Sequence, residues 1–433
     1  MMIIYSPVST PRLRYAGDIL GYELLGQPPL YTNDPEELNN YAGARINYSD
    51  QPLGETYWIR PAGLMGETGI RKQEVTVSEW KGNKILFPVA SDHPLDIFSS
   101  LFYLLSRYEE WLPHQVDEYG RYAHLNSIAW RENFLHEPLV DKWLADLGEI
   151  LQAKFKDFSA KRKEFRFLPT YDIDEAWSFR NKSVMISLAG TIKDIFRGRM
   201  NRVRERQKVR AGKIGDPFDS YDWMDSIHND YNLSPLYFFL VAGKRSRYDR
   251  NIDPSQPEFI ELVKRHASKY KIGIHPSWQS GDAQTLVSER SRLHSISAQE
   301  ISSSRQHFIR FRLPDTFRQL IDAGIRDEYS MGYGSVNGFR ASASFSFYWY
   351  DLEKEQQTSL KLHPFCFMDA NCFFEQRQTP LDAEQEMRAY YDRVKAVNGT
   401  FISIWHNTFL GTDPLFRGWR EAYLNFLKGT RQH

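Results

Sequence analysis

The stretch FRFLPTYDID, residues 165–174, joins an apolar and aromatic run to two aspartates at its end. The run has the composition of a β-strand. Side chains of an extended segment alternate between its faces, so Asp172 and Asp174 point to the same side. Two like charges on one face repel each other, a cost that is offset where a cation lies between them or one carboxylate serves as a base. From these residues alone, a pair of turn or helix-cap aspartates is the alternative.

Strand-like and helix-like segments alternate downstream of this stretch. Strand-like residues 234–243 precede helix-like residues 256–270, and strand-like residues 271–278 precede helix-like residues 283–296. Such alternation predicts βαβ units and a parallel sheet. Further strand-like segments bring the total to about seven, which predicts a closed α/β barrel rather than an open sheet; they are residues 304–311, 328–333, 337–345, 362–369 and 400–407.

The residues before this barrel have a different pattern. Short β-like runs come first and two helix-like segments, residues 93–112 and 138–155, follow them. This order predicts an α+β domain of unknown role over residues 1–160. The barrel domain is expected to occupy residues 161–433.

The overall composition is that of a soluble globular protein, with 41% hydrophobic and 25% charged residues in a chain of 433. The formal net charge is zero, so no global field favours nucleic acid, and we expect no nucleic-acid partner. Cys366 and Cys372 are the only cysteines, which excludes a disulfide scaffold and disfavours a cysteine zinc site. The N-terminus lacks the pattern of a signal peptide, and no stretch has the length of a membrane span. We therefore expect a cytoplasmic protein.

Residues 180–213 interrupt the alternation with a concentration of positive charge. Eleven Lys and Arg residues accompany only Asp194 and Glu205, which gives this segment a net charge of +9. Its first half places Ile and Phe on one helical face, and a basic amphipathic helix can lie on an anionic membrane surface. A solvated helix packed on the rim of the barrel is the alternative. We expect a basic helical insertion here, with peripheral membrane contact as one interpretation.

Side chains suited to metal binding or acid–base chemistry lie at or near the ends of the predicted strands. Loops that follow the strands of a parallel barrel share one face, where active sites lie. Residues far apart in sequence are therefore expected to meet there: Asp172, Asp174, His275, His307, Arg340 and His406.

Four motifs, TYDID, GIHPS, GFRASASF and FISIWHN, occur in this order between about residues 165 and 420. With them the chain resembles the polysaccharide deacetylases of carbohydrate esterase family four. The resemblance implies a distorted (β/α)7 barrel and a divalent metal, often zinc, held by one Asp and two His. It also implies hydrolysis of N- or O-acetyl groups on a sugar or polysaccharide.

The same resemblance implies roles for individual residues. Asp172 corresponds to the catalytic base and Asp174 to the metal-binding aspartate. His406 falls on the histidine near the end of the last strand, which as an imidazolium protonates the leaving group. Arg340 matches the arginine that orients the catalytic aspartate.

The second motif departs from the family pattern, because the residue four positions after His275 is Gln279 rather than a second His. His307 is our candidate for the third metal ligand, and Gln279 is the alternative. Two functional alternatives also stay open. One is a carbohydrate-binding protein on a degenerate barrel, and the other is a metal-dependent amidohydrolase of non-sugar C–N bonds.

Overall fold

A nine-stranded sheet forms the centre of the molecule in the computed structural model, which describes residues 1–161 and 163–431. Every neighbouring pair in it is parallel except β12 and β13, which form an antiparallel hairpin. In sheet order the strands are β12 (Phe347–Asp351), β13 (Gln356–Leu362), β11 (Asp327–Glu328), β10 (Ser303–Ser304), β9 (Lys271–Ile274), β8 (Leu236–Phe239), β7 (Arg166–Ile173), β15 (Thr400–His406) and β14 (Phe367–Met368).

The sheet must curve strongly, because β13 and β14 lie near its opposite edges and yet are close in sequence. Seven strand-to-strand steps separate them, which would place them about 34 Å apart in a flat sheet. Only residues 363–366 join them, and five Cα–Cα steps reach at most about 18 Å. No ladder joins the two edges within the described residues, so the expected parallel α/β sheet is present while closure into a (β/α)7 barrel is not shown.

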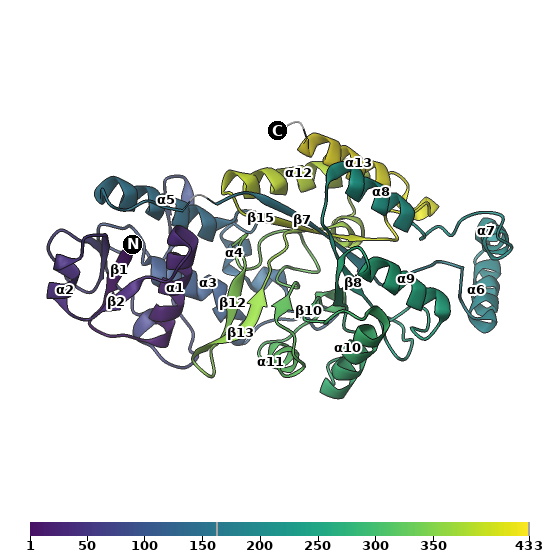
Figure 1. Cartoon of the computed structure of the whole chain (residues 1–433), viewed down its shortest axis with the longest axis horizontal. Helices are drawn as coiled ribbons and strands as arrows, with labels where there is room; N and C mark the ends of the chain where they lie inside the picture. Colours follow the sequence, from purple (N-terminus) through teal and green to yellow (C-terminus); the bar gives the residue numbers. More distant parts are fainter. Residues whose placement is uncertain (162, 432–433) are drawn as a thin grey trace.

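Helices lie outside this curved sheet (Figure 1). Their boundaries follow from local sequence: α12, for example, begins at Pro380 after a capping box between Thr379 and Asp382. In α9 the buried residues Phe259, Leu262 and Val263 recur at helical spacing. The outer helices are α8 (Tyr221–Tyr231), α9 (Pro257–Ala267), α10 (Ala283–Ser297), α11 (Asp315–Asp322), α12 (Pro380–Ala396) and α13 (Trp419–Thr430).

Four expected strands are absent or much shorter than predicted. Residues 328–333 contribute only Glu328 to β11, and residues 362–369 contain only the last residue of β13 and the two residues of β14. Residues 304–311 contribute only Ser304 to β10, because the chain turns at Phe308 and Ile309, whose φ angles are 60° and 54°. Residues 337–345 form no strand, since Gly338 and Ser342 have φ angles of 145° and 52°, which no β-strand adopts. His307 and Arg340 therefore lie on irregular segments.

The N-terminal part begins as an α/β unit, not the α+β arrangement expected from the sequence. Its four-stranded sheet, ordered β2-β1-β3-β4, is entirely parallel because helices or loops cross over between its strands. An antiparallel hairpin of β5 and β6 follows. The elements are β1 (Met2–Tyr5), α1 (Pro11–Leu25), β2 (Leu30–Thr32), α2 (Pro35–Asn40), β3 (Ala44–Tyr48), β4 (Tyr57–Ile59), β5 (Val77–Trp80), β6 (Asn83–Leu86), α3 (Ile97–Leu105), α4 (Ile128–Arg131) and α5 (Leu139–Lys154).

The N-terminal part packs tightly against the nine-stranded sheet. One hydrophobic core runs through both parts. At the contact, the buried guanidinium of Arg12 lies 2.5 Å from the carboxylate of Glu355. The carboxylate of Asp141 accepts hydrogen bonds from the backbone N–H and hydroxyl of Ser344. These buried polar contacts fix the orientation of one part on the other.

The basic segment forms two helices, α6 (Val184–Phe196) and α7 (Met200–Arg210), which confirms its helical character. The pair projects from the body of the molecule at the right-hand end of Figure 1. No helix in the described ranges, residues 1–161 and 163–431, is long and apolar enough to cross a membrane.

Candidate metal centre

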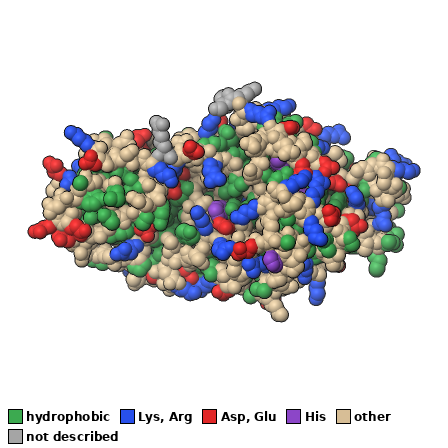
Figure 2. Space-filling model, viewed as in Figure 1, with side chains coloured by type: hydrophobic (Ala, Val, Ile, Leu, Met, Phe, Trp, Pro, Cys, Tyr) green, Lys and Arg blue, Asp and Glu red, His purple; other side chains and the backbone are tan. Residues whose placement is uncertain are grey.

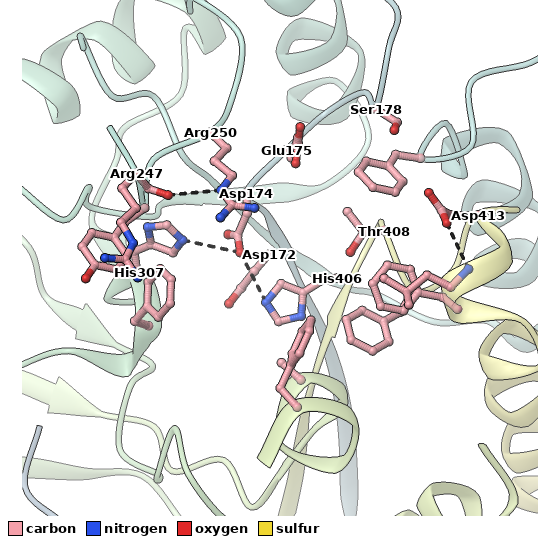
Figure 3. Close-up of a pocket in the computed structure, with 18 of the residues that line it drawn as sticks. Asp172, Asp174, Glu175, Ser178, Arg247, Arg250, His307, His406, Thr408 and Asp413 are labelled. Carbon is pink, nitrogen blue, oxygen red and sulfur yellow. Dashed lines mark hydrogen bonds and ion pairs between the residues drawn. The ribbon is translucent and has the colours of Figure 1, made fainter. Parts of the chain in front are cut away.

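The carboxylate of Asp174 lies among three imidazole rings at the carboxyl ends of the central strands. Nε2 of His275 lies 3.0 Å from Oδ1 of Asp174, and Nε2 of His307 lies 3.5 Å from Oδ2. Nε2 of His406 approaches the same Oδ2 to 3.6 Å from the other side (Figure 3). The structure thus brings Asp174, His275, His307 and His406 together.

Each imidazole is held by a partner at its other nitrogen. Nδ1 of His275 lies 2.6 Å from the backbone carbonyl oxygen of Arg305, which can only accept, so Nδ1 carries the proton. Nδ1 of His307 lies 3.2 Å from Oδ1 of Asp249. Nδ1 of His406 lies 2.6 Å from Oδ1 of Asp369, whose Oδ2 accepts the backbone N–H of His406. Such partners fix the ring orientation and leave Nε2 to face the cavity.

Three of these groups can hold a metal ion. One ligand atom each from Asp174, His275 and His307 lies within 4.8 Å of the other two. Ligands of one tetrahedral zinc ion at about 2.1 Å are about 3.4 Å apart, so small movements would bring these atoms into coordination. Nitrogen and carboxylate ligands of this kind suit zinc and other first-row divalent ions.

The site also contains a buried acceptor without a donor. Nε2 of His275 lies 3.0 Å from Oδ1 of Asp174. That oxygen is buried and has no hydrogen-bond partner within the part of the chain that the structure describes. A cation bound between Nε2 of His275 and Oδ1 of Asp174, such as a metal ion, would satisfy both atoms.

Charged neighbours shift the pKa values of the side chains in the cluster. Burial raises the pKa of Asp174, but His307 and His275 outweigh it and hold that pKa well below its usual range. Burial lowers the pKa of His307, whereas Asp174 and Asp249 raise it, to about 9 overall. Burial lowers the pKa of His406, whereas Asp369, Asp174 and Asp172 together raise it, to about 10 overall. The cluster itself, rather than the cavity as a whole, therefore favours bound positive charge.

Asp172 lies beside the cluster without joining it. It is a Cα partner of His406 in the neighbouring strand β15, and its Oδ2 is 3.9 Å from Nε2 of His275. Its Oδ1 accepts a 2.9 Å hydrogen bond from Nη1 of Arg305, which also donates to the hydroxyl of Thr170 at 2.7 Å. A fully buried arginine thus fixes the orientation of Asp172.

The arginine expected to orient Asp172 lies elsewhere. Arg340 forms a bidentate pair with Glu110, with distances of 2.8 and 2.6 Å, and its Nη1 donates to the carbonyl of Gly332. Its position on an irregular segment directs it toward the N-terminal part. Gln279 is exposed and does not line the cavity, so His307 rather than Gln279 faces Asp174.

The cluster opens into a cavity of about 1350 Å³. Tyr119, Tyr248 and Phe308 line it, with the ring centroids of Tyr119 and Phe308 5.2 Å apart. Another wall comes from the pair of α6 and α7 and carries several Lys and Arg side chains. Because Tyr119 belongs to the N-terminal part, both parts of the chain shape the cavity.

Three buried supporting residues were not predicted from the sequence. Asp369 ends a predicted strand, residues 362–369, so its position could have identified it. Arg305 lies two residues before His307, on a segment assigned to a longer strand than exists. Asp249 lies in a long loop and gave no signal, because only the fold brings it to His307.

Comparison with known families finds one match, in the N-terminal part. The sequence model described as "Family of unknown function (DUF7033)" matches residues 2–156. No curated protein matches the chain.

Solved structures resemble the chain over 62% of its length at low identity. One, described as "putative polysaccharide deacetylase from Mycobacterium smegmatis", has a TM-score of 0.40 and 14% identity over 85% of its own chain. Puue allantoinase has a TM-score of 0.40 and 10% identity over 84% of its chain. The polysaccharide deacetylase Bc1974 from Bacillus cereus has a TM-score of 0.31 and 9% identity over 89%. At these scores the likenesses carry no conclusion about residues or activity, which must come from the side chains themselves.

Proposed function

We propose that this chain is a metal-dependent hydrolase that removes acetyl groups from an N- or O-acetylated sugar or polysaccharide. The observation that carries the proposal is the buried Oδ1 of Asp174, which has no hydrogen-bond partner among the described residues, with Nε2 of His275 3.0 Å away and Nε2 of His307 near the same carboxylate. A base candidate and an acid candidate flank this cluster in one cavity. Metal-dependent hydrolysis of an acyl bond uses this combination.

Asp174, His275 and His307 would hold the ion, and zinc suits the set best. A bound divalent ion supplies polarisation of the acyl carbonyl and makes a water molecule more acidic. Hydrogen bonds from Nδ1 to the carbonyl of Arg305 and to Asp249 keep both Nε2 atoms directed at the site. The same contacts raise the basicity of the rings as ligands.

Asp172 is the proposed general base. Arg305 occupies its Oδ1, which leaves Oδ2 to accept the proton of the attacking water. The guanidinium of Arg305 also offsets the cost of burying the carboxylate. Arg305, not Arg340, is therefore the proposed positioning residue.

His406 is the proposed general acid. Asp369 binds its Nδ1, so Nε2 faces the cavity and can donate a proton to the departing amine or alcohol. Asp172 and His406 are Cα partners on adjacent strands, so both can reach the same acyl group. The two proton transfers thus have separate residues.

Two features of the cavity support a sugar substrate. Tyr119, Tyr248 and Phe308 present aromatic surface next to His307, and aromatic rings pack well on the apolar faces of sugar rings. Arg and Lys side chains along the wall formed by α6 and α7 can bind hydroxyl or acidic groups. The cavity is also large enough for more than one sugar unit.

A substrate panel tests the proposal. Metal-loaded protein should release acetate from at least one N- or O-acetylated sugar and not from non-sugar amides. Cleavage of a non-sugar C–N bond alone would instead identify an amidohydrolase. Glycan binding with full metal content and no acetate release would leave a carbohydrate-binding protein and remove the enzyme.

A further inference from the structure

Helix α6 carries its apolar side chains on the outside of the molecule. At about 100° per residue they fall within one arc of about 120°. Their exposed fractions range from 46% to 88%, values unusual for a continuous apolar face of a folded protein. This apolar face consists of Val184, Met185, Leu188, Ile192, Ile195 and Phe196.

The opposite face of α6 is polar and lies against α7. Ser187 and Asp194 are buried there. The guanidinium of Arg206 in α7 lies 2.6 Å from the carboxylate of Asp194 and donates to the hydroxyl of Thr191. A Cβ atom at Gly190 would lie 3.0 Å from this guanidinium, so glycine permits the close approach. An ordinary surface helix buries its apolar face, and α6 is fixed in the reverse orientation.

Positive charge flanks the apolar face. Arg202 and Arg206 pair with Asp413 and Asp194 and so serve the fold. Other basic side chains of the segment are exposed: Lys193, Arg197, Arg199, Arg204, Lys208, Arg210 and Lys213. Hydrophobic side chains and Lys and Arg side chains are both visible at the right-hand end of Figure 2, where the pair lies.

We propose that α6 and α7 form a peripheral binding element for an anionic lipid bilayer. The apolar face of α6 enters the interfacial region, and the exposed Lys and Arg side chains contact the lipid headgroups. The helix has 13 residues and is about 20 Å long, too short to span the hydrocarbon core, so it lies in the plane of the surface.

The charge and the apolar face together favour a lipid bilayer over other binding partners of this surface. A second copy of the chain would bring two segments of net charge +9 together, and their repulsion opposes such a dimer. A soluble acidic glycan would satisfy the charge but leave the apolar face in water. Because Gly190, Lys193 and Arg197 also line the cavity of the metal centre, attachment holds this cavity near the lipid surface.

Vesicle binding by the full chain tests the proposal. Co-sedimentation would use vesicles of phosphatidylcholine alone and of phosphatidylcholine mixed with phosphatidylglycerol, at low and high salt. The native protein should bind the mixed vesicles, and high salt should weaken this binding. Changing Arg204, Lys208 and Arg210, which are exposed and do not line the cavity of the metal centre, to Gln should lower the partition coefficient on the order of 100-fold, because each charge contributes about fivefold.

An apolar variant with Met185, Leu188 and Ile192 changed to Ser should lose at least about tenfold in binding. The matched control places Ser at Val8 and Leu381, which are 62% and 61% exposed elsewhere on the molecule, and should bind as the native protein does. Circular dichroism checks the fold of each variant.

Three results would overturn the proposal. The native protein could fail to bind anionic vesicles at low salt, or the apolar variant could bind them as well as the native protein does. Light scattering could also show a native dimer that the apolar variant converts to a monomer without any vesicle binding, which would make the face a subunit contact. None of these results bears on acetate release, so the proposed function is tested separately.

Discussion

Changing Asp172 to Asn separates the proposed base from the proposed metal ligands. The amide has the shape of the carboxylate, and its Oδ1 can still accept the 2.9 Å hydrogen bond from Arg305. The side chain is 2% exposed, and a substitution of equal volume opens no cavity. Asp174, His275 and His307 keep their positions, so we expect one bound metal ion at saturating metal.

The expected loss of rate follows from the missing proton acceptor. An amide cannot take a proton from the attacking water, and removal of a general base costs about two to four orders of magnitude in rate. This corresponds to about 3–5 kcal/mol of activation free energy. The variant should also melt at a lower temperature, because Arg305 loses its buried countercharge.

The assay is acetate release at saturating metal, expressed per folded molecule, with metal content measured on the same sample. The matched control is Glu110→Gln, which neutralises another buried carboxylate paired with an arginine, Arg340, away from the cavity. It should lose stability and keep the native rate. A fully metal-loaded Asp172→Asn variant that releases acetate at the native rate would refute the role of Asp172.

Three further predictions concern other residues. His307→Ala should weaken metal binding measured by competition with a chelator while Gln279→Ala should not, and the reverse result would assign the third position to Gln279. Arg305→Gln should lower acetate release at least about tenfold at equal metal content. Arg340→Gln should instead lower the free energy of unfolding by about 3–5 kcal/mol and leave the rate of acetate release unchanged. Equal losses of rate in the two variants would contradict the assignment of Arg305, and not Arg340, as the positioning residue. Burial raises the pKa of Glu328 from its usual 4.5 to about 7, so this group favours the folded state at low pH and that stability is lost as the pH rises through about 7. Glu328→Gln should therefore reduce the fall in stability between about pH 5 and about pH 8 by up to about 3 kcal/mol in denaturant titrations, and an unchanged pH dependence would contradict the assignment.

Residues at the ends of regular strands were predictable from the sequence. The period of two in β7 puts Asp172 and Asp174 on one side, and the strand–helix alternation puts His275 and His406 at the same end of a parallel sheet. The structure also brings His307 to this cluster, although by a turn and not by the strand on which it was placed.

Residues on irregular segments were not predictable in this way. Local sequence around Arg340 resembles a family motif, but the left-handed conformations at Gly338 and Ser342 direct the segment toward Glu110. Arg305 reaches Asp172 only because β10 ends after two residues. Such contacts depend on tertiary packing, which periodicity along a single chain does not encode.

Metal-dependent acetate release is the most direct test of the proposed function. Protein stripped of metal with a chelator should be inactive toward the best substrate of the panel, and titration with Zn²⁺ should restore activity to a plateau at about one equivalent. In the same titration, His275→Ala and Asp174→Ala should bind less metal and stay inactive. Acetate release by the stripped native protein at the rate of the metal-loaded protein would contradict the account.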